Sequence, residues 1–139
     1  MTVPLERLVY ESTATGSTTS LLNLVAILGE SQRNNDRAGL TGALAAHGER
    51  YIQVVEGSAG ALDGLLLRLG RDKRHRDIVI LERSPIAARA FADWSMASAR
   101  VTPELAPALD ALMAAPGGNA DRIAVLLKDA LTRQAAEIA

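Results

Sequence analysis

The order in which strand-like and helix-like stretches alternate constrains this chain more than any other feature of its sequence. Five apolar stretches bounded by turn residues favour strands, at 5–12, 40–46, 51–56, 78–81 and 94–99. Between them, leucines and valines recur at helical spacing after hydroxyl-bearing caps, at 19–34 and 58–71. The connection at 47–50 contains a glycine and has hairpin length, so the second and third strands should pair antiparallel. The predicted order is βαββαββ.

Two helices that each cross between strands by right-handed connections cover one face of a single sheet, as in ferredoxin-like sandwiches. Two further helical patterns, at 103–114 and 121–138, offer a cover for the other face. We therefore expect an α+β chain, a ferredoxin-like βαββαββ sandwich with two additional C-terminal helices. Residues 1–100 would form the main domain, and 101–139 a C-terminal helical extension that packs on the sheet.

Charge and cysteine content exclude several classes of function. The formal net charge is −1, so no positive field would attract nucleic acid or an anionic membrane surface. The chain has no cysteine, which excludes a disulfide framework and a thiolate metal site. No apolar stretch reaches the ~18–20 residues that a membrane span needs, and the N-terminus lacks the pattern of a secretion signal. We expect a cytoplasmic protein that uses neither nucleic acid nor membrane as its partner.

One tyrosine and one glutamine stand out because the predicted topology brings their strands together. The first and third strands are central neighbours in this fold, so Tyr10 and Gln53 can both point under the helices. A buried glutamine needs hydrogen-bond partners. Taken separately, Gln53 fits an exposed strand position equally well and Tyr10 fits an ordinary core aromatic. Neither residue alone proves a function.

Polar side chains also accompany the leucines of both predicted helices. Ser31, Asn34 and Asn35 lie with Ile27 on one stripe of the first helix. Arg68 and Asp72, four residues apart, lie beside the leucines of the second. If these stripes face each other, the groove between them suits a flat ligand with polar edges. Spacing alone favours solvated helix faces over such a groove.

Five short segments occur in an order and at a spacing that resemble the blue-light-using-flavin (BLUF) domain, over about residues 5–100. They are LVYES, SQRNNDRAGLTG, YIQVVEG, DKRH and RAFADWSM. The resemblance implies a photoreceptor and not an enzyme. It also implies a non-covalently bound flavin, FAD in the first place and FMN or riboflavin as alternatives, and no metal.

The resemblance implies roles for individual positions. Tyr10 matches the photoactive tyrosine, Gln53 the glutamine between it and the flavin, and Asn35 a residue that bonds the carbonyl edge of the ring. Trp94 and Met96 match a pair on the fifth strand whose placement beside Gln53 changes with the signalling state. The remaining flavin contacts implied in this way are Ile27, Ser31, Asn34, Arg68, Leu69, Asp72, Arg74 and His75. Tyr51 replaces the more usual phenylalanine and adds a second phenol.

The mechanism implied by the family is a change in hydrogen bonding without net chemistry. Tyr10 would give an electron and then a proton to the excited flavin, Gln53 would rearrange its hydrogen bonds, and absorption would shift to the red. The signal would leave through the fifth strand and the C-terminal helices, to a downstream protein partner or through a homo-oligomer. The apolar stripe of Ile123, Leu127 and Leu131 is a candidate contact surface, and packing on its own sheet is the alternative.

Two other functions fit the same topology. A ferredoxin-like small-molecule or acylphosphatase-type enzyme would need an arginine in the loop after the first strand, but residues 12–20 contain none. An RNA-recognition module would need a pair of sheet aromatics, whereas GERYIQVV offers one. The only histidines, His47 and His75, have no metal-site spacing. These alternatives are less well supported than the sensor.

Overall fold

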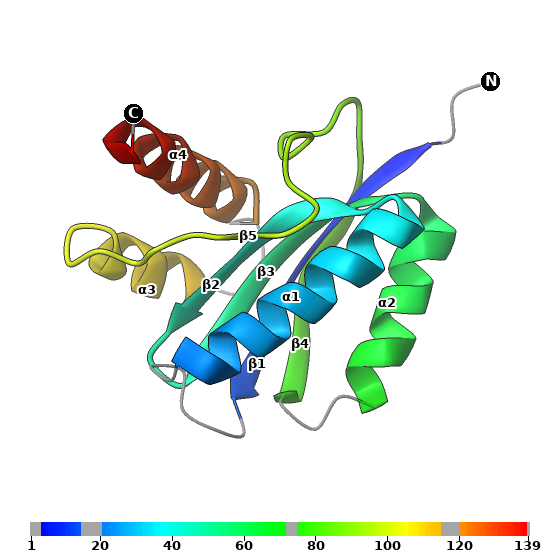
Figure 1. Cartoon of the computed structure of the whole chain (residues 1–139), viewed down its shortest axis with the longest axis horizontal. Helices are drawn as coiled ribbons and strands as arrows, with labels where there is room; N and C mark the ends of the chain where they lie inside the picture. The colour runs from blue at the N-terminus through cyan, green and yellow to red at the C-terminus, as the bar shows by residue number, and fades with distance from the viewer. Residues whose placement is uncertain (1–3, 15–20, 72–74, 115–119, 139) are drawn as a thin grey trace.

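The computed structural model describes residues 4–14, 21–71, 75–114 and 120–138, with the backbone alone at 14, 21–28, 31, 75 and 137–138 (Figure 1). Its strands are β1 (Leu5–Ala14), β2 (Thr41–His47), β3 (Arg50–Gly57), β4 (His75–Ile86) and β5 (Ala97–Ser98). Its helices are α1 (Leu21–Ala38), α2 (Ala59–Arg71), α3 (Ala106–Ala114) and α4 (Ala120–Ile138). The predicted element order is confirmed.

The strands form one sheet in the order β4-β1-β3-β2-β5. All neighbours pair antiparallel except β2 and β5, which are parallel. Figure 1 shows α1 and α2 in front of the sheet, while α3 and α4 pack on its other side. This is the expected α+β, ferredoxin-like arrangement with two added helices. The β2–β3 hairpin is also confirmed, and Gly48 takes a φ of 62° in its turn.

Helix α1 continues past Asn34, where the sequence suggested its end, because the residue that stops it is Gly39. Gly39 has a φ of 72°, a left-handed conformation that glycine adopts without strain. Its N–H bonds the carbonyl of Asp36 at 3.4 Å, and the N–H of Leu40 bonds the carbonyl of Asn35 at 2.8 Å. These two bonds form a Schellman cap. Asn34 and Asn35 therefore lie within the last turns of a continuing helix.

Three other boundaries differ from the sequence expectation. The fourth strand extends in both directions beyond 78–81, because it pairs with β1 along its length. The pairing contains two irregularities in register. The fifth strand shrinks from 94–99 to two residues, because the carbonyl groups of Ser95 and Met96 bond side chains of α1 and not a neighbouring strand. Helix α3 begins at Ala106 after a turn in which Thr102 accepts the N–H of Leu105.

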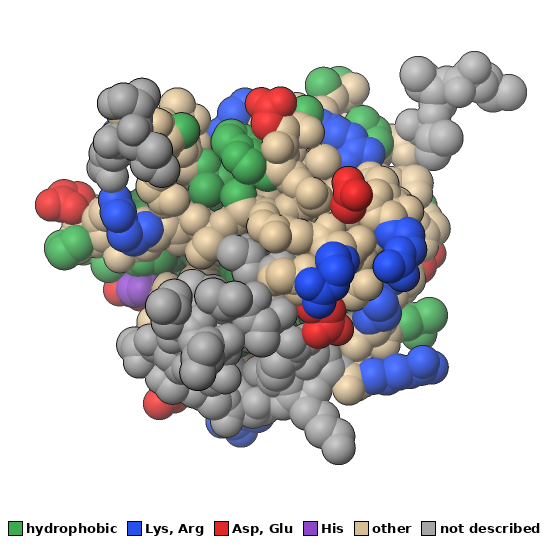
Figure 2. All heavy atoms as spheres, in the orientation of Figure 1, with side chains coloured by type: hydrophobic (Ala, Val, Ile, Leu, Met, Phe, Trp, Pro, Cys, Tyr) green, Lys and Arg blue, Asp and Glu red, His purple; other side chains and the backbone are tan. Residues whose placement is uncertain are grey.

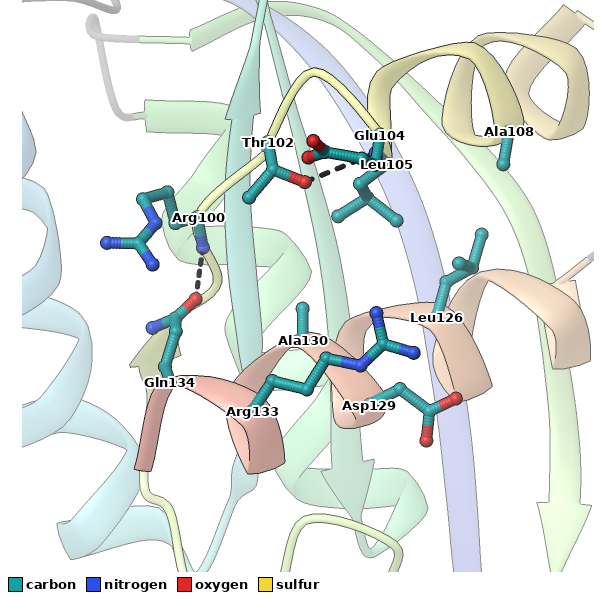
Figure 3. Close-up of a pocket in the computed structure, with 10 residues that line it drawn as sticks. All are labelled: Arg100, Thr102, Glu104, Leu105, Ala108, Leu126, Asp129, Ala130, Arg133 and Gln134. Carbon is teal, nitrogen blue, oxygen red and sulfur yellow. Dashed lines mark hydrogen bonds between the residues drawn. The ribbon is translucent and has the colours of Figure 1, made fainter. Parts of the chain in front are cut away.

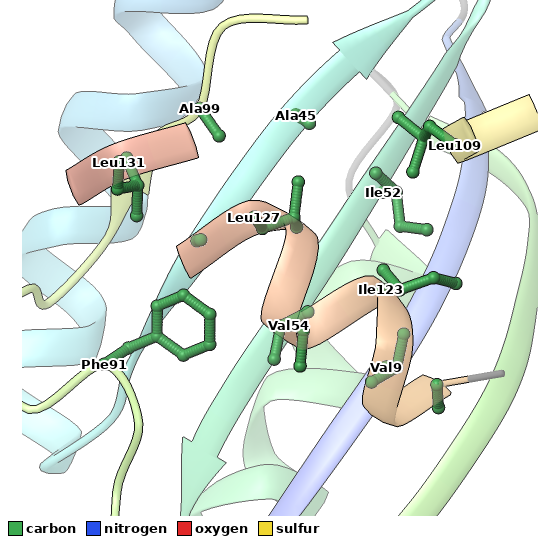
Figure 4. Close-up of a cluster of buried hydrophobic side chains, with 13 residues drawn as sticks. Val9, Ala45, Ile52, Val54, Phe91, Ala99, Leu109, Ile123, Leu127 and Leu131 are labelled. Carbon is green, nitrogen blue, oxygen red and sulfur yellow. The ribbon is translucent and has the colours of Figure 1, made fainter. Parts of the chain in front are cut away.

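Alternating strand residues build two separate cores, one on each face of the sheet. On the side of α1 and α2, sheet residues such as Leu8, Tyr10 and Leu44 pack against three buried leucines of α2, namely Leu62, Leu65 and Leu69. On the other side, Val9, Ile52 and Val54 pack beneath α3 and α4 (Figure 4). The sheet is therefore covered on both faces.

The apolar stripe of α4 faces its own sheet and is not a free contact surface. Ile123, Leu127 and Leu131 are 1%, 0% and 5% exposed, and they belong to the core beneath α3 and α4. The expectation that this stripe contacts a partner is wrong, and the alternative of intramolecular packing is confirmed. The stripe covers apolar sheet residues that would otherwise meet water.

The surface carries charges of both signs. Figure 2 shows blue and red side chains interspersed on the face that bears α1 and α2. Within the described part of the chain, no helix combines the length and the apolar character that crossing a bilayer requires.

The burial of the α4 stripe predicts a large difference between two substitutions on that helix. Leu127→Ala should lower the free energy of unfolding by about 2–5 kcal/mol, because it leaves a cavity in a closed core. Val125 is 59% exposed on the same helix. Val125→Ala should therefore change stability by less than about 0.5 kcal/mol. Urea unfolding followed by circular dichroism measures both, and equal effects would contradict this placement of α4.

Candidate functional site

The pairing of β1 with β3 places Tyr10 directly opposite Gln53. The Tyr10 hydroxyl donates a hydrogen bond of 2.6 Å to Oε1 of Gln53. The two residues are 1% and 3% exposed and point toward the side of α1 and α2. The structure thus brings together the two residues that the sequence singled out, in direct contact.

The amide nitrogen of Gln53 remains available for a further bond. It makes no hydrogen bond to any described residue, while the amide oxygen accepts from Tyr10. An amide nitrogen can donate two hydrogen bonds. A bound molecule that presents an acceptor beside Gln53 would satisfy this donor.

Helix α1 holds the segment before β5 by two side-chain amides. Asn35 is 1% exposed and donates from Nδ2 to the carbonyl of Ser95 at 2.7 Å. Gln32, one turn earlier, donates from Nε2 to the carbonyl of Met96 at 2.9 Å. The sequence analysis missed Gln32, although its spacing of three from Asn35 places both on one helix face. The amide oxygen of Asn35 makes no hydrogen bond within the described chain.

Trp94 and Met96 lie on opposite faces of the sheet. Met96 is 3% exposed and packs in the same core as Tyr10. Trp94 packs against the core on the α3 and α4 side, with its ring 6.3 Å from that of Phe91. The arrangement that the sequence left open is therefore one in which Met96 lies on the Gln53 side and Trp94 does not.

The remaining residues singled out by the resemblance fall into four groups. Leu69 is 7% exposed in the core under α2, and Asn34 is half-buried near the end of α1. Arg68 is exposed on α2. Ile27 and Ser31 lie in α1 and His75 begins β4, but their side chains are not described. Asp72 and Arg74 lie outside the described residues.

A cavity of about 340 Å³ lies elsewhere, between α3 and α4 (Figure 3). Its walls carry Arg100, Arg133 and Gln134 together with apolar residues such as Leu105 and Leu126. None of the residues singled out from the sequence lines it. The chemistry of Tyr10 and Gln53 is therefore separate from this cavity.

The polar groups on the α1 and α2 side fit a flat heterocycle with both donors and acceptors on its edge. The unused amide nitrogen of Gln53 supplies a donor, and the unused amide oxygen of Asn35 supplies an acceptor. The buried side chain of Leu69 adds apolar surface. These groups match the carbonyl and N–H edge of a flavin ring. Within the described ranges, no three His, Asp or Glu side chains are grouped so as to hold a metal ion.

Comparison with known proteins agrees with this geometry. The family model described as "BLUF: Sensors of blue-light using FAD" matches residues 5–97. The photoactivated adenylate cyclase subunit beta of Euglena longa is 36% identical over 96 residues, which are 68% of this chain and 11% of that protein. The chain thus spans about a tenth of the length of this curated relative.

Solved structures show the same likeness. The dark-state structure of BlrB, a BLUF protein, is 30% identical with a TM-score of 0.78, and the match covers 95% of this chain and 99% of BlrB. A bacterial light-regulated adenylyl cyclase is 29% identical with a TM-score of 0.70, over 79% of this chain and 33% of the cyclase. The match to BlrB extends to nearly the whole chain, including most of the C-terminal helices.

The two adjacent asparagines of α1 predict a matched pair of stability effects. Asn35→Ala removes the bond to Ser95 and leaves a partly buried carbonyl without its donor, so the free energy of unfolding should fall by about 1–3 kcal/mol. Asn34 is half-buried and makes no side-chain hydrogen bond to a described residue, so Asn34→Ala should cost less than about 0.5 kcal/mol. Denaturant unfolding of the two variants compares them, and a larger loss for Asn34→Ala would refute the α1 contact.

Proposed function

The chain belongs to the BLUF family of blue-light sensors that use FAD, and from this premise we propose that Tyr10 and Gln53 are its photoactive pair. The observation that carries the proposal is the buried hydrogen bond of 2.6 Å from the Tyr10 hydroxyl to Gln53, with the amide nitrogen of Gln53 left free to bond the flavin. Asn35 is proposed to bond the carbonyl edge of the ring with its unused amide oxygen or a reoriented amide.

A bound flavin supplies a strong oxidant when it absorbs blue light. The phenol of Tyr10 is the proposed electron donor, and its hydroxyl proton can pass to the amide of Gln53 because the two groups are already hydrogen-bonded. Return of the electron and proton to Tyr10 leaves Gln53 in a changed hydrogen-bonding state. No substrate is consumed, so the output is a change in the hydrogen bonds around Gln53.

The flavin is proposed to be FAD, as the description of the matching family states, with FMN or riboflavin as alternatives. Its other proposed contacts are those implied by the resemblance, namely Ile27, Ser31, Asn34, Arg68, Leu69, Asp72, Arg74 and His75. Burial supports Leu69, which lies in the same core as Tyr10. Arg68 is exposed, which supports a contact with the polar part of the ligand at the rim of the proposed site.

We propose that the chain itself is a sensor without enzymatic activity and that it acts on something outside residues 1–139. The adenylate cyclases that resemble this chain are much longer, and the match covers 11% of one and 33% of the other. The division into a flavin-binding domain at 1–100 and a helical extension at 101–139 is part of the proposal. A homo-oligomeric state, a downstream protein partner and a cytoplasmic location remain predictions.

The absorption spectrum of the flavin-loaded protein tests the proposed function. Blue light should shift the absorption of the oxidised flavin reversibly to the red, because the changed hydrogen bonds at Gln53 lower its excitation energy. Recovery in darkness should restore the first spectrum. A protein that binds no flavin, or whose bound flavin shows no shift, would contradict the proposal.

Two variants test the roles of the pair. Tyr10→Phe and Gln53→Leu should both bind flavin and lose the persistent red shift, since one lacks the donor and the other the relay. Tyr51→Phe is the matched control: Tyr51 is a second buried phenol on the same face of β3 as Gln53, and the residue opposite it on β1 is Ser12. It should keep the shift. A normal light response in Tyr10→Phe would exclude Tyr10 as the donor.

A further inference from the structure

The connection between β4 and β5 has to pass from one edge of the sheet to the other. Midway along it, the carboxylate of Glu56 accepts the N–H of Ala90 at 2.7 Å and the N–H of Phe91 at 2.8 Å. Glu56 is the second-last residue of β3 and is 0% exposed. A buried carboxylate thus fixes the backbone of a segment more than thirty residues away in the sequence.

The carboxylate also accepts a hydrogen bond from β2, and Arg89 bonds the groups around it. The hydroxyl of Thr41, the residue opposite Glu56 on β2, donates to it at 3.2 Å. Arg89 donates to that hydroxyl at 2.8 Å, to the carbonyl of Glu56 at 3.0 Å and to the carbonyl of Gly39 at 2.8 Å. Arg89 therefore ties the connection to the ends of α1 and β3 as well. Hydrogen bonds that involve ionised groups are the stronger ones in proteins.

The chain changes faces of the sheet immediately after this anchor. Phe91 and Trp94 pack on the side of α3 and α4, whereas Met96 packs on the side of Tyr10. Asn35 holds the carbonyl of Ser95 within this crossing. Residues 92–96 thus lie between the backbone bonds to Glu56 on their N-terminal side and the bond from Asn35, a proposed flavin-site residue, to Ser95.

We propose that Glu56 is a positioning residue for the light response, which anchors the connection so that Met96 lies on the Gln53 side in the dark. The inference rests on the proposed function and extends it to a residue that touches neither Tyr10 nor Gln53. With Phe91 fixed, a change at Gln53 or Asn35 can move only the short crossing at 92–96. Without the anchor, the whole connection can shift and the preference for one arrangement becomes weaker.

Glu56→Gln tests the anchor while keeping the size of the side chain. The new amide group turns a donor toward the backbone N–H groups, so only one of its two polar atoms can accept. In the dark, the amide protons of Ala90 and Phe91 should exchange at least tenfold faster. Quenching of Trp94, the only tryptophan, by acrylamide should move toward its value in light. The light-induced red shift should lose at least half of its amplitude.

Glu6→Gln is the matched control because it makes the same chemical change at a hydrogen-bonded carboxylate elsewhere on the sheet. Glu6 bonds Arg83 at 2.7 Å, in the contact between β1 and β4, and touches no residue of the connection after β4. The exchange of Ala90 and Phe91, the quenching of Trp94 and the amplitude of the red shift should all match the parent protein. A control that behaves like Glu56→Gln would overturn the proposal.

Faster amide exchange in Glu56→Gln with unchanged Trp94 quenching and an unchanged red shift would show a purely structural role and overturn the inference.

If Glu56→Gln does not fold, Thr41→Val is the second variant, because it removes the hydroxyl that bonds the carboxylate. Trp94 quenching and the red shift should change in the same direction, and amide exchange should be at least threefold faster. A parent protein without a red shift would refute the proposed function. Amide exchange and Trp94 quenching in the dark would still decide whether Glu56 anchors the connection.

Discussion

The antiparallel pairing of β1 with β3 is the constraint on which the rest of the structure depends. Its register sets Tyr10 opposite Gln53 and so creates the buried contact between phenol and amide. The same register turns Val9 and Val54 to the opposite face, where α4 covers them. Because side chains alternate along a strand, a slip of either strand by one residue would turn its side chains to the opposite face. Tyr10 and Gln53 would then lie on different faces of the sheet.

The two faces of the sheet communicate through one short crossing of the chain. The side of α1 and α2 contains Tyr10 and Gln53, the proposed photoactive pair, while the other side contains a closed apolar core against α4. Residues 92–96 pass between them, held by Glu56 at one end and by amides of α1 at the other. Beyond the crossing, Gln134 of α4 donates to the carbonyl of Ser98 and accepts the N–H of Arg100. A continuous series of contacts therefore leads from the side of Tyr10 and Gln53 to α4.

The candidate site was predictable to the extent that it depends on residue type and strand periodicity. Tyr10 and Gln53 could be singled out because the predicted topology places their strands side by side. Asn35 could be singled out only through the resemblance to the BLUF domain. Gln32 and Glu56 could not be found in this way. Both act on backbone groups of a distant segment, and any residue type at that segment offers the same N–H and carbonyl groups. The spacing of three places Gln32 on the same helix face as Asn35, but it does not show which distant backbone groups these amides contact.

The sequence by itself determined the element order, the α+β class, the hairpin and the side of the sheet on which Tyr10 and Gln53 lie, because periodicity and turn residues are local properties. Only the tertiary structure decided where α1 ends, how short β5 is, and which of Trp94 and Met96 lies on the same side of the sheet as Tyr10 and Gln53. It also decided that the apolar stripe of α4 is buried on its own sheet. The outcome depends on which of two distant partners a group contacts. The carbonyls of residues 95 and 96 bond side chains of α1 and not a strand, and the α4 stripe packs on its own sheet and not on a second protein. A pattern of residues states what a segment can contact, but only the packed chain selects the contact.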